Sequence, residues 1–313
     1  MSSHSPEVAG TKAVREAFAR ADAWRRTRST LVRALLYLAL TALALIILWP
    51  VIIVITTSLK PASEINLVNF TLFPKKWEFL NYPTAMTQGD WPRYFFNSAF
   101  VTFWSVVGSL LFNSLAGYSF ARLKFKGHQI LFAFFLIGIM IPPQSLLIPQ
   151  FIIMHHIPLA GGNNIIGNGG DGWINSFWAL IVPQLSGSFG IFLCRQFYLG
   201  FPWSLDDAGM IDGAGAVRRY VMIFLPMSGP VLATLTVLKT VYVWNDFFFP
   251  LIMTNSQRMQ TVQLALYNFR GQFGVVWQLL MAGTLLTIVP VVVVFLAMQR
   301  YFIQGIANQG IKG

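Results

Sequence analysis

Two charged residues in an apolar stretch, Lys239 and Asp246, are the first candidates for chemistry in this sequence. A charged side chain in the hydrocarbon of a bilayer costs at least roughly 2.5 kcal/mol, so each is expected to face a cavity or a partner group. Their spacing along a helix puts the two on nearly the same face but about 10 Å apart along the axis. We therefore expect each residue to meet water or a neighbouring helix, and not the other.

The residue types that carry enzyme chemistry do not form a recognisable set. Cys194 is the single cysteine, which excludes internal disulfides and thiolate metal sites. The four histidines, His4, His128, His155 and His156, have no metal-ligand spacing. The sequence also lacks a Gly-x-x-x-x-Gly-Lys-Ser/Thr loop for holding ATP. We expect a non-catalytic chain with no metal and no cofactor of its own.

The composition is that of a helical membrane protein. Apolar residues make up 55% of the 313 and charged residues only 11%, against about 25% charged in soluble domains. The apolar blocks are long enough to cross a bilayer, which takes roughly 20 helical residues, and they lack the alternation of membrane strands. The net charge of +11 comes from basic residues beside these blocks, which is typical of topology signals and does not indicate nucleic acid.

Six membrane-spanning helices are predicted, which gives an all-α membrane fold. Their approximate ranges are 32–56, 98–121, 129–153, 176–195, 227–251 and 277–299. Prolines in the third and fourth spans predict kinks or breaks, which suit a transport path better than a simple anchor; they are Pro142, Pro143, Pro149 and Pro183. Residues 1–30 are predicted to be a basic cytoplasmic tail without a cleavable signal, and residues 31–313 the membrane domain.

The distribution of basic residues predicts that both termini lie in the cytoplasm. With the amino terminus inside, the cytoplasmic segments hold 15 Lys and Arg residues and the outer segments hold six. The positive-inside rule favours this orientation. Between the third and fourth spans, the outer segment 161–172 is rich in Gly and Asn and is predicted to be a flexible, turn-rich loop. A calcium loop is the alternative, with Asp171 as its single carboxylate.

The cytoplasmic stretch after the fourth span has the pattern of two short helices. Ser204 is placed to cap the first helix, with Asp207 as its reciprocal partner, and Asp206 adds negative charge at the positive helix end. Gly213 can end that helix in a left-handed conformation.

The first helix has one thin face, made by Ala208 and Gly209, which lets another protein approach closely. The second helix carries Arg218 and Arg219 towards Leu225-Pro226. An ordinary amphipathic connector is the alternative interpretation.

This stretch resembles the cytoplasmic coupling motif of binding-protein-dependent ABC importers, which reads Glu-Ala-Ala, then Asp-Gly-Ala, then Leu-Pro. Here the three elements are Asp207-Ala208-Gly209, Asp212-Gly213-Ala214 and Leu225-Pro226. Asp in place of Glu at 207 shortens the stem by one methylene. Gly in place of Ala at 209 costs about 1 kcal/mol of helix propensity.

Other stretches are similar to the maltose-type carbohydrate permeases, and in particular to the second, smaller permease of the pair. The similarity covers nearly everything after about residue 30. The matching stretches are Ser58-Leu59-Lys60-Pro61, Asn81-Tyr82, Asn97-Ser98, Ala116-Gly117-Tyr118-Ser119-Phe120-Ala121-Arg122, Trp244-Asn245-Asp246-Phe247 and Gly310-Ile311-Lys312-Gly313.

The resemblance implies a type I ABC importer permease fold with coupling helices at about 202–224, in a bacterial or archaeal cytoplasmic (inner) membrane. It implies these partners: a homologous second permease, two copies of an ATP-binding subunit that hold ATP and Mg, an extracytoplasmic solute-binding protein, a carbohydrate and membrane lipid. It also implies that the last residues reach into the interface between the ATPase subunits, although a frayed terminus is the alternative. Those residues are Asn308, Gln309, Gly310, Ile311, Lys312 and Gly313.

If the solute is a carbohydrate, residues of the fifth span are candidates to line the translocation path. Trp244, Asn245 and Asp246 fall near its outer part and Lys239 falls deeper. Aromatic faces stack on sugar rings, while amides and carboxylates bond hydroxyls. A tryptophan at this depth also suits an interfacial belt.

Two functions from other classes are the alternatives to a permease subunit of an ATP-driven carbohydrate importer that couples ATPase motion to alternating access. A self-sufficient secondary transporter is expected to show internal repeats and intramembrane acids for ion coupling, and a membrane-embedded enzyme needs a convergent catalytic set. The sequence shows no clear inverted repeat, and Asp246 is the single acid in a predicted span.

Overall fold

The computed structural model describes residues 7–65, 71–271 and 274–309, and the side chains of 30–65, 71–270 and 274–300. Within these ranges the chain is mostly helical, as the composition predicts. The helices are α1 (Glu7–Ser58), α2 (Asn81–Thr87), α3 (Trp91–Arg122), α4 (His128–Met140), α5 (Leu147–His155), α6 (Phe177–Ile181), α7 (Ser188–Leu199), α8 (Ser204–Ile211), α9 (Ala216–Arg219), α10 (Leu225–Met227), α11 (Gly229–Trp244), α12 (Phe248–Met253), α13 (Val262–Tyr267) and α14 (Trp277–Gln309).

Short elements join these helices. In the described part of the chain, four of them are 3₁₀ turns, at Ala62–Glu64, Pro143–Leu146, Val182–Gln184 and Gln257–Met259. A π-helical turn, η4 (Tyr220–Phe224), lies between α9 and α10. Two short antiparallel strands, β1 (Arg270–Gly271) and β2 (Gly274–Val275), form a small hairpin before α14.

Six spans fit the described helices when each bent helix pair is taken as one span. Among the described residues, four single stretches are long and apolar enough to cross a membrane: Thr30–Ser58, Trp91–Arg122, Phe177–Leu199 and Trp277–Arg300. Two further pairs pass the same test but are bent, by 104° between α4 and the stretch Pro143–His155, and by 77° between Ala216–Met227 and α11. The predicted all-α, six-span fold is therefore confirmed by length and composition.

Proline determines where two spans break, as the sequence predicts. The third span bends at Pro142-Pro143, and the fourth changes from α6 to a 3₁₀ turn at Pro183 before α7 begins. No break occurs at Pro149, so that part of the prediction is wrong. Pro149 lies in the first turn of α5, where the missing N–H has no helical partner in any case.

The long helix α3 is the centre of the bundle. It packs along α7 and α11, and α11 in turn packs on α14. Gly117 permits the α3–α7 approach, because a Cβ there would lie 2.5 Å from Cys194 Cβ and 2.8 Å from the Arg195 backbone nitrogen. At the other end, the Asn97 amide donates to the Arg258 and Gln260 carbonyls at 2.8 Å each. α3 is thus bound to its neighbours at both ends.

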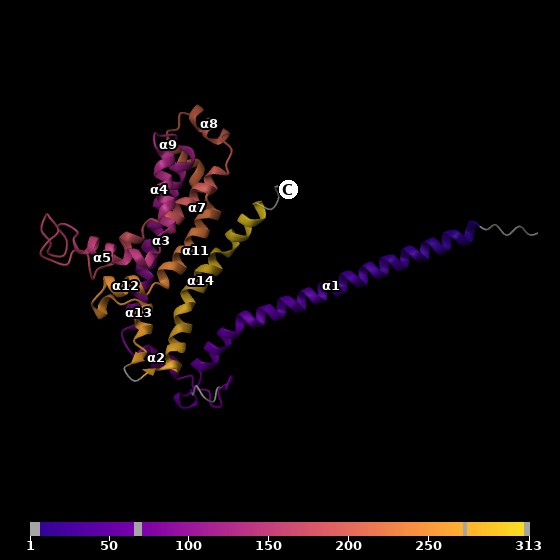
Figure 1. Cartoon of the computed structure of the whole chain (residues 1–313), viewed down its shortest axis with the longest axis horizontal. Helices are drawn as coiled ribbons and strands as arrows, with labels where there is room; N and C mark the ends of the chain where they lie inside the picture. The colour runs from indigo at the N-terminus through magenta and orange to yellow at the C-terminus, as the bar shows by residue number, and fades with distance from the viewer. Residues whose placement is uncertain (1–6, 66–70, 272–273, 310–313) are drawn as a thin grey trace, which may run out of the picture.

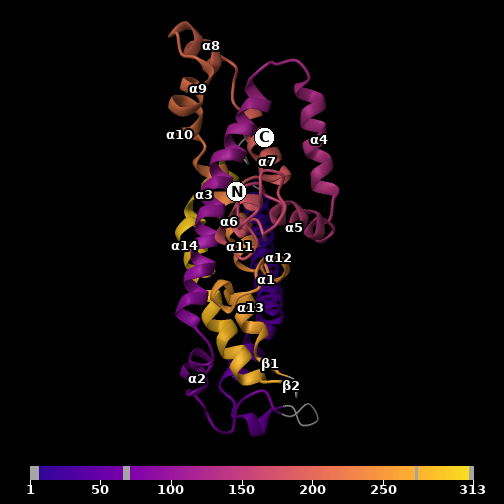
Figure 2. The ribbon, with the colours of Figure 1, turned by 90° about the vertical axis from the view of Figure 1, so that its left-hand side faces the viewer.

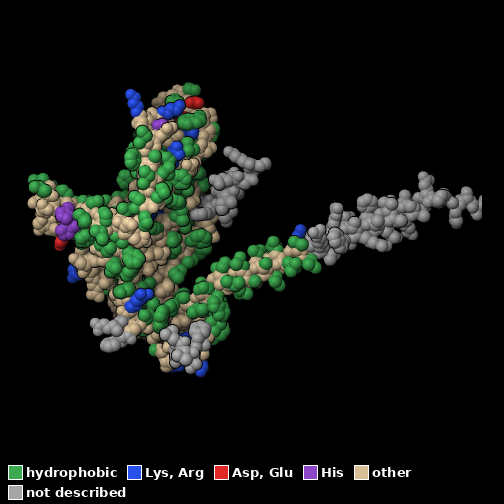
Figure 3. Space-filling view, viewed as in Figure 1, with side chains coloured by type: hydrophobic (Ala, Val, Ile, Leu, Met, Phe, Trp, Pro, Cys, Tyr) green, Lys and Arg blue, Asp and Glu red, His purple; other side chains and the backbone are tan. Residues whose placement is uncertain are grey.

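The first helix leaves the bundle, as Figure 1 shows. α1 continues through residue 30 without a break, so the predicted division between a tail and a first span is not a change in secondary structure. Every described side chain from Thr30 to Val51 is exposed, and the stretch is apolar all round. A helix of this kind is stable against lipid or another apolar helix. Figure 3 shows this apolar surface continuing over the bundle.

The Gly-rich outer loop is organised around one side chain. The Asn163 amide donates to the His155 and Ile157 carbonyls at 2.7 and 3.1 Å and accepts from the Gly170 N–H at 2.8 Å. Glycines at 161, 162, 167, 169 and 172 have positive φ, so the turn-rich prediction is confirmed. The Oδ1 atom of Asp171 lies 3.6 Å from Nε2 of His155. No group of three His, Cys, Asp or Glu side chains that could hold a metal ion occurs among the described residues, so Asp171 has no second carboxylate beside it for a calcium site.

Candidate functional site

A compact hairpin, residues 202–227, stands at one end of the molecule. It consists of α8, α9, η4 and α10, and Figure 2 shows it at the end opposite to α2, β1 and β2. Gly213 ends α8 with a φ of +71°, as the sequence predicts. The Gly213 N–H donates to the Met210 carbonyl at 3.0 Å and the Ala214 N–H donates to the Gly209 carbonyl at 2.8 Å. These bonds satisfy the last carbonyls of α8 and turn the chain into α9.

The predicted capping role of Ser204 is wrong. The N-cap of α8 is Trp203, Ser204 is already the first helical residue, and no side chain bonds to the cap. Trp203 is itself in a helical conformation, and its carbonyl accepts the Asp206 and Asp207 N–H groups at 2.9 and 3.1 Å. The chain enters the helix one residue earlier because Pro202 and Trp203 already form a turn. Asp206 and Asp207 do lie in the first turn, where negative charge is favourable.

The two adjacent aspartates have opposite surroundings. Asp206 is 3% exposed, and its carboxylate lies between two guanidinium groups, 3.0 Å from Arg122 Nε and 3.5 Å from Arg219 Nε. Burial raises the pKa of the Asp206 carboxyl, and the positive charges of Arg122 and Arg219 act in the opposite direction. Asp207 is exposed. Of the two, Asp207 is the one that can reach another protein.

Arg122, the last residue of α3, is the residue that the sequence interpretation missed. Its side chain is fully buried, its Nη2 donates to the Pro202 carbonyl at 2.9 Å, and its guanidinium lies over the rings of Trp203 and Phe224 at 4.5 and 5.0 Å. Arg219 Nη1 donates to the Ala214 carbonyl at 3.1 Å. A basic residue at the end of a span is typical of a topology signal. Apart from the family resemblance of the stretch 116–122, nothing in the sequence therefore indicates that Arg122 pairs with Asp206.

Gly209 serves packing within the hairpin, which corrects its predicted role on a face left thin for a partner. Gly209 is buried, and a Cβ there would lie 2.9 Å from Arg219 Cδ and 3.1 Å from Ile223 Cδ1. The absence of a side chain therefore lets the second half of the hairpin close over α8. Ala208 is exposed and remains on the outer face.

The outer face of the hairpin is apolar with charged edges. Met210, Ile211 and Val217 are 53%, 86% and 72% exposed. Asp207, Asp212 and Arg218 are exposed beside them, and Figure 3 shows hydrophobic and charged side chains gathered at this end. Exposed apolar side chains rimmed by polar residues mark protein interaction sites.

The hairpin joins the membrane helices at the Leu225-Pro226 element. Pro226 lies in the first turn of α10, and the chain bends by 77° between Met227 and Gly229. At the bend, the buried Ser228 hydroxyl lies 2.6 Å from the Phe224 carbonyl and 2.8 Å from the Tyr198 hydroxyl of α7. The bend is therefore fixed to two helices of the bundle.

The predicted transmembrane residues separate into two environments. Lys239 Nζ donates to Gln184 Oε1 at 2.9 Å, so it meets a neighbouring helix and not Asp246, as the spacing predicts. Trp244 is 5% exposed, and its Nε1 donates to the Thr287 carbonyl at 2.9 Å. Trp244 is therefore a core residue between α11 and α14. It neither lines the translocation path nor lies in an interfacial aromatic belt in this structure.

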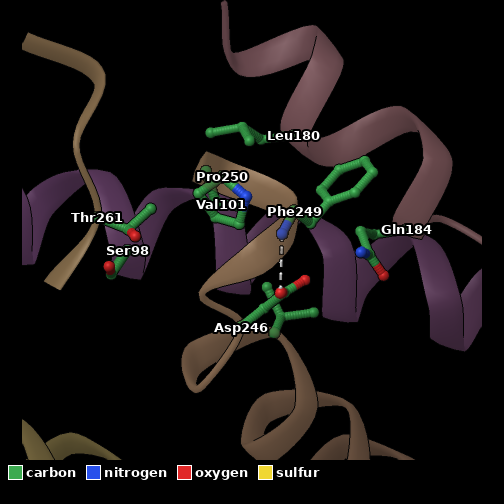
Figure 4. A pocket seen from close by; sticks show the side chains of 9 residues that line it. Ser98, Val101, Leu180, Gln184, Asp246, Phe249, Pro250 and Thr261 are labelled. Carbon is green, nitrogen blue, oxygen red and sulfur yellow. Dashed lines mark hydrogen bonds between the residues drawn. The ribbon is translucent and has the colours of Figure 1, made fainter. Parts of the chain in front are cut away.

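Asp246 lies two residues before α12 and lines a narrow pocket (Figure 4). Its Oδ1 accepts the Phe249 N–H at 3.1 Å. The free volume is about 10 Å³, which is room for about one water. Asn245 is exposed and accepts from Gln263 Nε2 at 3.3 Å. The pocket-lining side chains are Ser98, Val101, Leu180, Gln184, Val243, Asp246, Phe249, Pro250 and Thr261.

The predicted carboxyl-terminal contact can be placed only in part. Asn308 and Gln309 are the last residues of α14. Residues 310–313, which include Ile311 and Lys312, lie outside the described residues.

Comparison with known proteins agrees with the fold. The model of the binding-protein-dependent transport system inner membrane component family matches residues 113–308. The arabinooligosaccharides transport system permease protein AraQ of Halalkalibacterium halodurans is 33% identical over 92% of this chain and 100% of its own length. The protein of the same name from Bacillus subtilis is 31% identical over 90% and 96%.

A solved structure has the same fold. It is the crystal structure of a bacterial ABC transporter involved in the import of the acidic polysaccharide alginate, with a TM-score of 0.70 and 18% identity over 96% of this chain and 100% of the matched chain. Together with the family match, these findings show that the chain belongs to the binding-protein-dependent transport system inner membrane components and is a multi-pass membrane protein of the carbohydrate ABC importer permease type.

Proposed function

We propose that this chain is one permease of an ATP-driven importer of a sugar or oligosaccharide, and that its 202–227 hairpin receives the movement of a partner ATPase. The observation that carries the proposal is the hairpin itself. It presents an apolar face with charged edges at one end of the molecule, in a chain whose sequence has no ATP-holding loop. The energy therefore comes from another subunit.

The proposed assembly pairs this chain with a homologous second permease and two copies of an ATP-binding subunit that bind ATP and Mg. A solute-binding protein on the outer side delivers the carbohydrate. When ATP closes the ATPase pair, the hairpin moves, and the membrane helices change from an inward-facing to an outward-facing arrangement. Hydrolysis and product release reset them.

The names of the relatives support an oligosaccharide as the solute. Two of them are permeases for arabinooligosaccharides, and another is the multiple sugar-binding transport system permease protein MsmG of Streptococcus mutans. A structure with the same fold is a transporter in complex with a periplasmic protein bound to an alginate pentasaccharide. An uptake panel of neutral and acidic oligosaccharides is the direct test of the solute class.

Replacing the exposed Ile211 tests coupling without disturbing the hairpin core. We expect Ile211→Asp to abolish vanadate-sensitive uptake of the best oligosaccharide of the panel in proteoliposomes, because the 86% exposed side chain contacts the ATPase in the proposed complex. Ile165→Asp in the outer loop is the matched control, since Ile165 is 78% exposed. Uptake that persists in Ile211→Asp, or uptake by this chain without any ATPase, contradicts the proposal, and the second result favours a secondary transporter.

A further inference from the structure

The contacts between the hairpin and α3 fall on one face of one helix. Ser114, Tyr118 and Arg122 are four residues apart along α3, so they share that face. The Ser114 and Tyr220 hydroxyls are 2.6 Å apart, and the Tyr118 hydroxyl donates to the Ala216 carbonyl at 3.2 Å. These two contacts reach the second half of the hairpin.

Arg122 is the contact that also reaches the first half. Its Nε lies 3.0 Å from Asp206 Oδ2 in α8, its Nη2 donates to the Pro202 carbonyl at 2.9 Å, and its guanidinium lies over the rings of Trp203 and Phe224. Phe224 belongs to η4, so a single guanidinium touches both sides of the hairpin. A planar group with several fixed donors suits such a joint better than a lysine does.

The hairpin is braced internally around the same carboxylate. Arg219 pairs with Asp206 at 3.5 Å and bonds the Ala214 carbonyl at 3.1 Å. Its side chain also covers Gly209, where a Cβ would lie 2.9 Å from Arg219 Cδ. The hairpin therefore holds together as a unit around Asp206.

On the far side of α3, close packing continues into α7. The Gly117 position leaves no room for a Cβ against Cys194 and Arg195. A displacement of α3 is therefore passed to α7 by direct contact of the two backbones, since packed helices are not easily compressed.

We propose that Arg122 is the positioning residue that joins the hairpin to α3, so that α8, α9 and α3 move as one body when the hairpin is displaced. The inference rests on the proposed function for the source of the displacement. It assigns Asp206 to this internal joint and leaves Asp207 for the partner, although the two are neighbours in the same motif. The ring stack and the buried ion pair make the joint, and α7 is the next helix to move.

Distances between spin labels test the joint in the complete complex. The tagged chain is purified with its associated subunits from its own host and reconstituted in nanodiscs, with and without ATP and vanadate. One label pair, Ser204→Cys with Leu111→Cys, measures the hairpin against α3 from a hairpin residue that is given no ATPase contact; a second, Leu111→Cys with Val293→Cys, measures α3 against α14. All three side chains are exposed, and the native Cys194 is buried, so wild type gives the background labelling.

In the otherwise wild-type chain, we expect the distance between labels at 204 and 111 to stay narrow and unchanged on vanadate trapping, while the 111–293 distance shifts. In Arg122→Gln, the 204–111 distance distribution broadens and shifts, and the 111–293 shift is lost. Arg122→Lys, which keeps the charge but not the fork or the stack, gives an intermediate broadening and covers the case in which Arg122→Gln does not insert.

Arg195→Gln is the matched control at the end of α7. Arg195 lies over the Phe132 ring at 4.1 Å and bonds the Phe120 carbonyl at 3.3 Å, so its contacts among the described residues join α7 to α3 and α4. A narrow, unchanged 204–111 distance with a full 111–293 shift in both Arg122 variants overturns the joint. So does a wild-type complex that traps vanadate without any 111–293 shift. Absence of an ATPase subunit from the purified complex instead contradicts the proposed function.

Discussion

At the scale of single residues, burial separates neighbours that look equivalent in the sequence. Asp206 and Asp207 are adjacent acids in the first turn of α8, yet one is enclosed by two arginines and the other is exposed. Removing one member of a buried ion pair leaves an uncompensated charge, whereas removing an exposed charge costs little. Substitution of Asp206 should therefore lower the stability of the protein, whereas substitution of Asp207 should weaken the contact with a partner.

We expect Asp206→Ala to lower stability by about 3–5 kcal/mol, because Arg122 and Arg219 lose their common partner. Asp207→Ala is expected to change stability by less than about 1 kcal/mol but to weaken retention of the ATPase subunit. Thermal unfolding of the purified chain in detergent, followed by co-purification of the tagged complex, measures both effects. Equal melting temperatures for the two variants contradict the separation of roles.

At the scale of elements, close helix contacts depend on positions without a side chain. α3 and α7 approach most closely at Gly117, where a Cβ would meet Cys194 Cβ at 2.5 Å and a backbone nitrogen at 2.8 Å. A Cβ added to Gly229, at the start of α11, would meet no neighbouring element within 4 Å among the described residues. The two glycines are thus a matched pair, one in a filled position and one in an open position.

Gly117→Ala is expected to destabilise the bundle by about 1–3 kcal/mol, since the backbone of α7 must shift to admit the methyl group. Gly229→Ala should be neutral or stabilising, because alanine has the higher helix propensity. Melting temperature in detergent and the fraction of monodisperse protein give the comparison. A Gly117→Ala protein as stable as Gly229→Ala would mean that the contact between α3 and α7 is looser than the structure has it.

The elements were largely predictable from the sequence, whereas the contacts between them were not. Span number, the break at Pro142-Pro143 and the end of α8 at Gly213 follow from local chemistry: apolar length, a missing N–H and a positive φ. The Arg122–Asp206 pair joins residues far apart in the chain, and no local pattern indicates it. Trp244 was misplaced for the same reason, because its indole bonds the Thr287 carbonyl in another helix.

At the scale of the whole molecule, the remaining question is which side of the membrane the hairpin occupies. The hairpin and the α2–β2 end lie at opposite ends of the bundle (Figure 2), so one orientation fixes both. Basic residues are concentrated in the segments predicted to lie on the hairpin side, 15 against six, and such asymmetry predicts that this side is cytoplasmic. The coupling proposal requires the same side, because ATP is available there.

Labelling of single introduced cysteines tests this orientation directly. Ile211→Cys reports the hairpin end, and Glu78→Cys reports the segment between α1 and α2, on the opposite side. The native thiol is buried, so the unmodified chain sets the background. We expect a membrane-impermeant maleimide to label position 78 in intact cells and position 211 only in inverted vesicles. The reverse pattern would put the hairpin on the outer side, out of reach of any cytoplasmic ATPase, and coupling through Asp207 and Ile211 would then be impossible.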